Sequence, residues 1–446
     1  MAATESKLSA VFGDPVDEKA LAQIETVLKD ERAVTGALMA DHHLGYSMPI
    51  GGVVAYKDAI SPSGVGFDIA CGNKAVRTNV LFSELGEMKP LMRQIQKRIA
   101  FGLGRSSGER VEHELFESPV WHELGKPGLD LRQKAAAQLG TVGSGNHYVD
   151  ILADDEGYTW IANHFGSRGM GHTIATWFLA VAQGGNVGDR VPEREEPAVL
   201  DIGTAGGDLY VEAMHLAGAY AYAGRDYVIS QVLGILGNPK VTFEVHNHHN
   251  FAWKEGGYWV VRKGATPLTP EPAFIGGSMG DVSVIVRGKV ESDFSSRPSD
   301  QHGVTEIGAL GSAPHGAGRT MSRTAAAGKL RKMWACGNHR NCEFSPIRSM
   351  ANDPPPNDGK CPECGHRLRK VKMRDPSTAA IDWDDARYLL EERGITVLGG
   401  GADESPGVYK NLRTVLGLHS NIEVMHELHP QGVVMAGSDI FDPYKD

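Results

Sequence analysis

The chain has 446 residues, 41% hydrophobic and 22% charged, a balance that excludes wholesale disorder. Its 45 basic and 55 acidic residues give a net charge of −10, so any nucleic acid must bind a local basic patch rather than the protein's overall charge. Glycine is in excess, at 55 residues without a Gly-x-y period, which predicts many tight turns and close contacts between backbone and ligand.

The predicted elements mix helices and strands without a regular βαβ rhythm. Apolar residues at helical spacing predict helices over 15–40, from about Pro90 to Gly102, from about Asp208 onward, and over 380–393. Alternating stretches predict strands over 74–82 and 146–152 and a β-rich region over 241–290. Together these elements predict an α+β fold, with a large mixed β-sheet core and flanking helices.

Residues 331–375 differ from their surroundings, because they are rich in Lys, Arg, Pro and Asn and poor in aliphatic side chains. We predict that they form a small zinc-ribbon-like insertion, and that 1–330 and 376–446 form the main unit. The basic residues of the insertion could contact phosphates or could simply be a solvated face.

Four of the five cysteines lie in this insertion. CPECGH (361–366) holds two of them at the Cys-x2-Cys spacing that lets two thiolates meet one tetrahedral ion. His339 lies between the other two and could replace either of their thiolates. We expect a structural Zn²⁺ here rather than four free thiols on an exposed loop. The predicted ligands are Cys336, Cys342, Cys361 and Cys364.

The cysteine usage and the absence of long apolar runs predict a cytoplasmic protein. Five cysteines are an odd number in a chain too long to need disulfide bonds, which favours a reducing compartment. No stretch approaches the ~20 apolar residues that cross a bilayer, and the first residues lack a signal-peptide core, so we expect no membrane association.

A second group of metal-binding residue types is dispersed along the chain. Cys71 follows Asp68 by three residues in GVGFDIACG, and His147, His164 and His315 lie in similarly Gly- or Asn-rich segments, as does the cluster HNHH at 246–249. Thiolate, carboxylate and imidazole ligands on such turns favour a transition-metal site, with zinc, iron and manganese all compatible. The alternative is that Cys71 is a buried structural thiol.

Several common nucleotide and hydrolase motifs are absent. There is no G-x-x-x-x-G-K-[ST] loop and no G-x-G-x-x-G in a strand-to-helix setting. G-x-S-x-G occurs at 104–108 and 276–280 but outside the setting of a nucleophile elbow, which argues against a serine hydrolase. GSRGMG (166–171) is interpreted as a turn that shapes a phosphate or metal site.

The motifs, taken together, resemble those of the RtcB RNA ligases. The resemblance implies the RtcB-like fold and an enzyme that uses GTP to join RNA 3′-phosphate or 2′,3′-cyclic phosphate ends to 5′-hydroxyl ends, in RNA repair or tRNA splicing. It also implies RNA as substrate and an archease-type activator as a possible partner. The blocks that carry it are GYSMPIGGVVAY (45–56), GVGFDIACGNKAVRTN (64–79), GSGNHYVDI (143–151), HFGSRGMGH (164–172), HHNFAWKE (248–255), RKGAT (262–266), GGSMG (276–280) and HGAGRTMSR (315–323).

The same resemblance assigns roles to single residues. It implies two Mn²⁺ ions that share Cys71, with Asp68 and His147 on one ion and His164 and His249 on the other. The histidine of HGAGR, His315, would by the same resemblance attack the α-phosphate of GTP and carry GMP. The implied nucleotide-binding residues are Asn146, Asp150, Asn250, Gly276, Gly277, Ser278, Met279, Ser283, Gly316, Ala317, Gly318, Arg319, Tyr409 and Met435.

Two of these nucleotide-binding positions depart from the family pattern. Asp150 stands where the family commonly has Glu, and Met435 stands where it has a Lys that contacts guanine.

Two other functions are alternatives to the RNA ligase. One alternative is a dimetal phosphoesterase that opens 2′,3′-cyclic phosphates without nucleotidyl transfer. The other is a non-catalytic zinc-ribbon adaptor for RNA.

Overall fold

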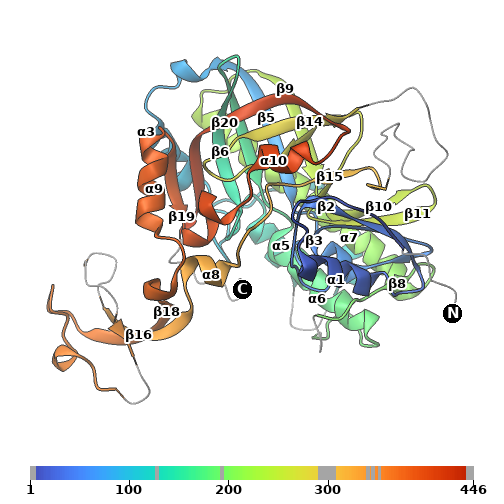
Figure 1. Cartoon of the computed structure of the whole chain (residues 1–446), viewed down its shortest axis with the longest axis horizontal. Helices are drawn as coiled ribbons and strands as arrows, with labels where there is room; N and C mark the ends of the chain where they lie inside the picture. Colours follow the sequence, from blue (N-terminus) through green and yellow to red (C-terminus); the bar gives the residue numbers. More distant parts are fainter. Residues whose placement is uncertain are drawn as a thin grey trace.

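The protein is built around two β-sheets with helices on their outer faces (Figure 1). This computed structural model describes residues 7–125, 130–190, 195–289, 308–337, 342, 347–349 and 353–437.

The larger sheet has eight strands within the described residues, in the order β13-β14-β20-β6-β7-β5-β9, with β19 pairing with β20. All neighbours are antiparallel except β19, which runs parallel to β20, so the sheet is mixed. Its strands are β5 (Gly72–Leu81), β6 (Tyr148–Asp154), β7 (Tyr158–His164), β9 (Val241–His248), β13 (Ala273–Ile275), β14 (Ser283–Gly288), β19 (Thr396–Gly400) and β20 (Ile422–Gly437).

The second sheet has five strands in the order β1-β2-β3-β11-β10. It is continuous in sequence with the first, because β9 leads directly into β10. Its strands are β1 (Leu8–Val11), β2 (Ala33–His43), β3 (Ile50–Tyr56), β10 (Asn250–Glu255) and β11 (Tyr258–Lys263). Two short pairs complete this part of the fold: β4 (Ala59–Ile60) with β8 (Leu200–Asp201), and β12 (Ala265–Pro267) with β15 (Ser312–Pro314).

Helices flank both sheets, and α3 packs against β19 and β20 while α7 packs behind β5 and β7. The longest, α7, begins where the Thr204 hydroxyl accepts a hydrogen bond from the Gly207 N–H, with Asp208 in its first turn. The helices are α1 (Glu18–Val27), α2 (Pro62–Val65), α3 (Met88–Arg98), α4 (Val120–Glu123), α5 (Leu131–Gln138), α6 (Arg168–Ala182), α7 (Ala205–Ile235), α8 (Arg323–Ala327), α9 (Trp383–Glu392) and α10 (Leu412–Gly417).

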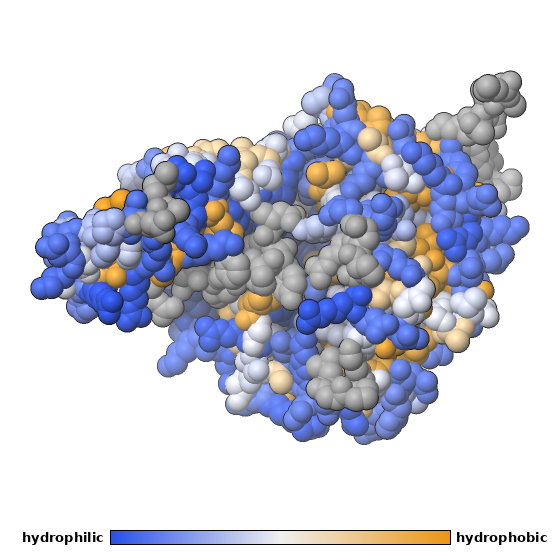
Figure 2. Space-filling view, turned by 90° about the horizontal axis from the view of Figure 1, so that it is seen from below, coloured by the Kyte–Doolittle hydropathy of each residue, from blue (hydrophilic) through white to orange (hydrophobic). Residues whose placement is uncertain are grey.

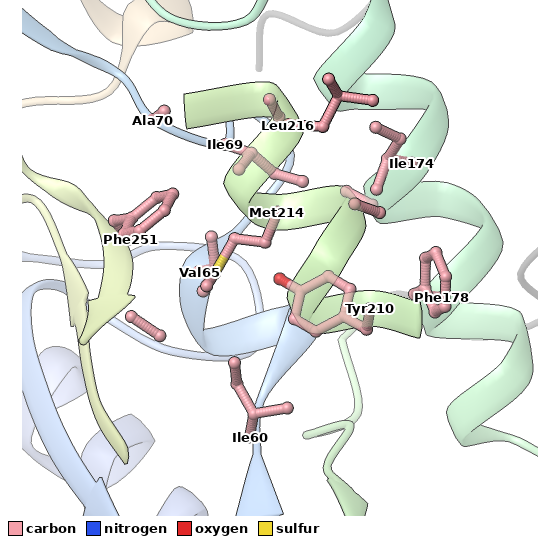
Figure 3. Packing of buried hydrophobic residues seen from close by; sticks show 14 of the residues in the cluster. Ile60, Val65, Ile69, Ala70, Ile174, Phe178, Tyr210, Met214, Leu216 and Phe251 are labelled. Atoms are coloured by element: carbon pink, nitrogen blue, oxygen red, sulfur yellow. The ribbon is translucent and has the colours of Figure 1, made fainter. Parts of the chain in front are cut away.

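The main hydrophobic core lies where α6 and α7 pack against the loop before β5 (Figure 3). Phe178 of α6 and Tyr210 of α7 have ring centroids 5.2 Å apart. Ile69 and Ala70, which immediately precede Cys71, are fully buried against the same helices. Burying a side chain such as Ile69 contributes about 1.5–3 kcal/mol, so this packing fixes the loop that carries Asp68 and Cys71.

The predicted α+β class with a large mixed sheet is confirmed, and two local predictions are wrong. The helix expected over 15–40 ends at Val27, and β2 begins at Ala33. Most residues of β2 are buried on both faces, so the strand lacks the alternation that would have marked it. GSRGMG is not a simple turn, because Arg168 already begins α6.

A small three-stranded sheet projects from the body beyond α8 (Figures 1 and 2). It consists of β16 (Leu330–Cys336), β17 (Ile347–Arg348) and β18 (Leu368–Arg374), in the order β17-β16-β18. We call residues 330–374 the cysteine arm. None of the helices in the described parts of the chain is long and apolar enough to cross a membrane.

Candidate metal and nucleotide site

Five predicted metal ligands meet at one end of four neighbouring strands of the large sheet. His147 directly precedes β6, His164 ends β7, Cys71 directly precedes β5, and His249 directly follows β9. The strands β6, β7, β5 and β9 are successive antiparallel neighbours. The start of β6 and β5 and the end of β7 and β9 therefore lie side by side, at one end of these strands. Asp68 joins them from the loop before β5, where its carbonyl accepts a hydrogen bond from the Cys71 N–H.

These ligand atoms form two overlapping groups that share the Cys71 sulfur. Cys71 Sγ lies 3.2 Å from His164 Nε2 and 3.7 Å from His147 Nε2. His164 Nε2 lies 3.3 Å from His249 Nε2, and His147 Nε2 lies 3.0 Å from Asp68 Oδ2. In each group the ligand atoms all lie within 4.8 Å of one another. The arrangement therefore fits two cations that share one thiolate.

The protonation states of these groups suit a metal site. Burial and neighbouring charges hold the pKa of His164 and of His249 well below the usual value, so both rings are neutral at pH 7 and offer lone pairs. Burial and the Asp68 carboxylate raise the pKa of the Cys71 thiol. A divalent cation would reverse that effect, because a coordinating thiol is deprotonated. Thiolate, imidazole and carboxylate together fit a transition metal.

Gly166 leaves room for the carboxylate that completes this group. A Cβ atom at residue 166 would lie 2.3 Å from Asp68 Oδ1, closer than any real contact, so a larger residue would displace the carboxylate.

A buried arginine holds the loops that carry the ligands. Arg225 of α7 is fully buried, and its Nη1 donates to the carbonyl oxygens of Ala70 at 3.0 Å and Phe165 at 2.7 Å. Ala70 and Phe165 are the direct neighbours of Cys71 and His164. Arg225 therefore positions two ligands without touching them, and burial lowers its own pKa to about 10.

His315 faces this site and is fixed by a carboxylate from the other sheet. It directly follows β15, and its ring centroid lies 4.8 Å from that of His249. Asp41 of β2 is fully buried, and its Oδ2 lies 2.7 Å from His315 Nδ1. The backbone N–H groups of His315 and Gly316 donate to the same oxygen at 3.0 and 3.3 Å. Burial raises the pKa of Asp41, but its charge interaction and hydrogen bonds with His315 outweigh this and lower it.

This contact fixes the tautomer of His315. An ionised carboxylate only accepts hydrogen bonds, so in the neutral form of the ring Nδ1 carries the proton and Nε2 has the lone pair. Gly318 makes the turn possible, since its φ is +74° and a Cβ there would lie 2.2 Å from the Asp41 carbonyl oxygen.

A pocket of about 880 Å³ opens over these residues. Its lining includes all five metal ligands and His315, and the nucleotide residues that the resemblance implied except Ser283. Ser283 lies behind the GGSM turn, where its hydroxyl accepts a hydrogen bond from the Gly277 N–H at 3.0 Å. The lining nucleotide residues are Asn146, Asp150, Asn250, Gly276, Gly277, Ser278, Met279, Gly316, Ala317, Gly318, Arg319, Tyr409 and Met435.

Cations and an aromatic ring line one wall of the pocket. Arg319 Nη1 donates to the Tyr409 hydroxyl at 3.2 Å, and its guanidinium lies 5.1 Å from the centre of the Tyr409 ring. Arg323 pairs with Glu404. Lys263 also lines the pocket, and burial lowers its pKa to about 7. Arg319 and Lys263 can each donate hydrogen bonds to a phosphate-bearing ligand, whereas the charge of Arg323 is balanced by Glu404.

The four arm cysteines lie together as one metal site would require. Cys336 and Cys364 Sγ are 3.4 Å apart, and Cys342 and Cys361 Sγ are 3.6 Å apart, with all four within 4.8 Å. A disulfide would bring two sulfurs to about 2.05 Å. Four Zn–S bonds of about 2.3 Å place the sulfurs about 3.8 Å apart, so the spacing fits zinc. His339, the possible substitute ligand, lies outside the described residues.

Comparison with known proteins decides the family. A family model described as "tRNA-splicing ligase RtcB" matches residues 23–127 and 122–342. The chain belongs to the RtcB family. "RNA-splicing ligase RtcB" of Escherichia coli K12 is 33% identical over 323 residues, covering 65% of this chain and 75% of that protein. "tRNA-splicing ligase RtcB" of Thermococcus kodakarensis is 29% identical over 372 residues, covering 66% of this chain and 74% of that protein.

An RtcB relative also occurs among eukaryotes. "RNA-splicing ligase RtcB homolog 1" of Entamoeba dispar is 29% identical over 376 residues, covering 67% of this chain and 68% of that protein. The resemblance that the motifs indicated is thus confirmed at the level of the family.

Sequence reasoning missed the residues that hold the site in place. Asp41 lies just beyond the segment 15–40 that was expected to be helical, and it is 274 positions away from His315 in the sequence. Its signal was a lone carboxylate directly after the apolar run ALMA. Arg225 gave a similar signal, as a charged residue in an Ala- and Tyr-rich helix. One boundary also needs correction: the strand predicted over 146–152 begins only at Tyr148, so Asn146 and His147 precede it, and both line the pocket.

Proposed function

We propose that this protein is a GTP- and Mn²⁺-dependent RNA ligase that joins 3′-phosphate or 2′,3′-cyclic phosphate ends to 5′-hydroxyl ends. Membership of the RtcB family and the names of the relatives support an RNA ligase. The observation that carries the finer proposal is His315, whose Nδ1 is bonded to Asp41 while its ring lies against the Cys71 group.

In the first step, His315 Nε2 attacks the α-phosphorus of GTP. A P–N bond forms, the bond to the β-phosphate oxygen breaks, and pyrophosphate leaves. The Nδ1 proton remains shared with Asp41, which stabilises the positive charge that develops on the ring. Arg319 and the backbone of the HGAG turn face the pocket, where they would bind the nucleotide's phosphates.

The RNA then replaces the imidazole. An oxygen of the RNA 3′-phosphate attacks the GMP phosphorus, the P–N bond breaks, and His315 is regenerated. The 5′-hydroxyl of the second RNA attacks the activated 3′-phosphorus and releases its proton to water, and GMP leaves with its electron pair. This order suits the chemistry, because a 3′-phosphate alone has no good leaving group and must be activated first.

Two Mn²⁺ ions would be held by Asp68, Cys71 and His147 and by Cys71, His164 and His249. When bound, such ions orient phosphates and disperse their negative charge. The proposal also assigns a structural Zn²⁺ to the four arm cysteines, because a site with four protein ligands leaves no open position for substrate. The division into a catalytic unit (1–330 and 376–446) and an insertion (331–375) is part of the proposal.

The test is a joining assay with two RNA fragments. One ends in a radiolabelled 3′-phosphate and the other begins with a 5′-hydroxyl; both are incubated with the protein, GTP and Mn²⁺. We expect a joined product in which the labelled phosphate is protected from phosphatase, and no product with His315→Ala. Opening of a 2′,3′-cyclic phosphate without any joined product would instead establish the phosphoesterase alternative.

A further inference from the structure

The cysteine arm carries a charge opposite to that of the rest of the protein. Residues 330–374 contain ten Lys and Arg residues and four Asp and Glu residues, a net charge of +6 in a chain of −10. Four thiolates with one Zn²⁺ would lower this to +4. The arm is thus the kind of local basic patch that an otherwise acidic protein needs to bind a polyanion.

Three lysines lie together on one face of the arm's sheet. Lys332 of β16 pairs directly with Lys372 of β18, and Trp334 pairs with Lys370. Directly opposite residues share a face, and so do residues two apart, so all four side chains point the same way. The three lysines are exposed, and Lys370 Nζ lies 5.0 Å from the centre of the Trp334 ring.

No acidic side chain in the described part of the chain pairs with the lysines of this face. Among the described residues, Lys332 and Lys372 have no ion pair or side-chain hydrogen bond. Two like charges directly opposite each other on a sheet destabilise it, so the pair opposes the folding of the arm. Phosphate groups bound between the lysines would remove this repulsion.

The base of the arm is fixed to the rim of the pocket. Arg323, which begins α8, lines the pocket, and α8 leads directly into β16. Arg374 at the end of β18 donates to the Gly328 carbonyl at 2.9 Å and to the Thr324 hydroxyl at 3.3 Å, both at α8. The base of the arm is therefore held beside the pocket.

We propose that the lysine face of the cysteine arm binds the phosphate backbone of single-stranded RNA whose end lies in the pocket. Lysines with a partly exposed tryptophan between them suit single-stranded RNA, because it offers phosphates to the lysines and unpaired bases to the aromatic ring. The inference rests on the proposed RNA substrate and adds a second contact region to it. The nine residue-to-residue steps from Arg323 to Lys332 span at most about 32 Å. A stacked strand rises about 3.4 Å per nucleotide, so an RNA of roughly ten nucleotides can reach both regions.

The test measures binding of fluorescent single-stranded RNAs that end in 3′-phosphate, about 20 and about 4 nucleotides long, in the absence of GTP. The variant Lys332→Gln/Lys370→Gln/Lys372→Gln is compared with wild type and with Lys332→Arg/Lys370→Arg/Lys372→Arg. A matched control removes three exposed lysines elsewhere: Lys57→Gln/Lys89→Gln/Lys240→Gln. Zinc content and Tm verify that each variant is folded.

The expected effect follows from counterion release. For single-stranded nucleic acid, the logarithm of the binding constant falls linearly with the logarithm of the salt concentration, with a slope of about −0.7 per phosphate contact. Loss of three contacts therefore reduces the size of this slope by about 2. At 0.1 M salt this loss raises the Kd for the longer RNA by about 100-fold. If only one of the lysines contacts a phosphate, the Kd rises by about fivefold. The short RNA and the arginine variant should bind as wild type does.

Two results would overturn the inference. One is a triple glutamine variant that binds the longer RNA as tightly as the control variant, with the same salt slope. The other is wild-type protein that does not bind the longer RNA. Failure of the proposed function is a separate result: wild-type protein that binds RNA but gives no joined product.

Discussion

Replacing Asp41 by Asn tests the role of the carboxylate behind His315. The wild-type carboxylate can only accept, so it keeps the proton on Nδ1 and leaves Nε2 as the nucleophile. An asparagine amide can present either its oxygen or its NH₂ group to Nδ1. When NH₂ faces the ring, the proton moves to Nε2 and the nucleophilic lone pair is lost.

The size of the effect follows from the bond that is lost. Asp41 is fully buried and accepts from His315 Nδ1 at 2.7 Å, so this is a charge-assisted hydrogen bond in a water-poor setting. Such bonds contribute about 1.5–3 kcal/mol. We therefore expect the rate of GMP transfer to the protein to fall by about 10- to 150-fold in Asp41→Asn.

The assay is single-turnover formation of the GMP adduct from α-labelled GTP. Asp155→Asn is a matched control, because Asp155 also contacts a histidine, with its Oδ1 2.9 Å from His429 Nε2, but at the surface. It should change the rate by less than about twofold. An Asp41→Asn variant with wild-type Tm and an unchanged rate would refute the reasoning about the tautomer.

Three further changes have distinct outcomes. Cys71→Ser should lower bound manganese from about two ions per chain to less than one without changing zinc, measured by elemental analysis, because both ligand groups share this sulfur. Cys361→Ser/Cys364→Ser should lose zinc and keep manganese; loss of both metals would contradict the two-site division. Lys263 has its pKa lowered to about 7, so the unfolded state binds more protons above pH 7 and the free energy of unfolding should rise with pH. From pH 7 to 9 this amounts to about 2 kcal/mol in urea titrations, and Lys263→Met should remove that rise; an equal rise in both proteins would contradict it.

The sequence revealed those parts of the fold whose signal is local. The long helix from about Asp208 was predicted because its apolar positions recur at helical spacing, and α7 covers it. β2 was missed because a strand buried on both faces shows no alternation, and its apolar run resembles a helix. Only the sheet order, which the sequence does not encode locally, reveals that the segment is a strand.

In the candidate site too, the sequence revealed the residues with a local signal and missed those that act through contacts between distant segments. The motifs that carry the family resemblance contain Cys71 and His315, and the structure brings these residues into one pocket. Asp41 and Arg225 lie outside those motifs and act through contacts between distant segments, His315 in one case and the Ala70 carbonyl in the other. Such positioning residues become visible only when packing is known, because nothing in the nearby sequence shows which partner a buried charge will find.

The most direct test of the whole account is to identify the residue that carries GMP. The protein is incubated with GTP and Mn²⁺, digested at alkaline pH, and analysed by mass spectrometry. The account predicts an acid-labile, base-stable GMP adduct on the peptide that contains His315, absent when that residue is alanine. GMP attached to another residue, or no adduct from protein that holds its manganese and still opens cyclic phosphates, would contradict it.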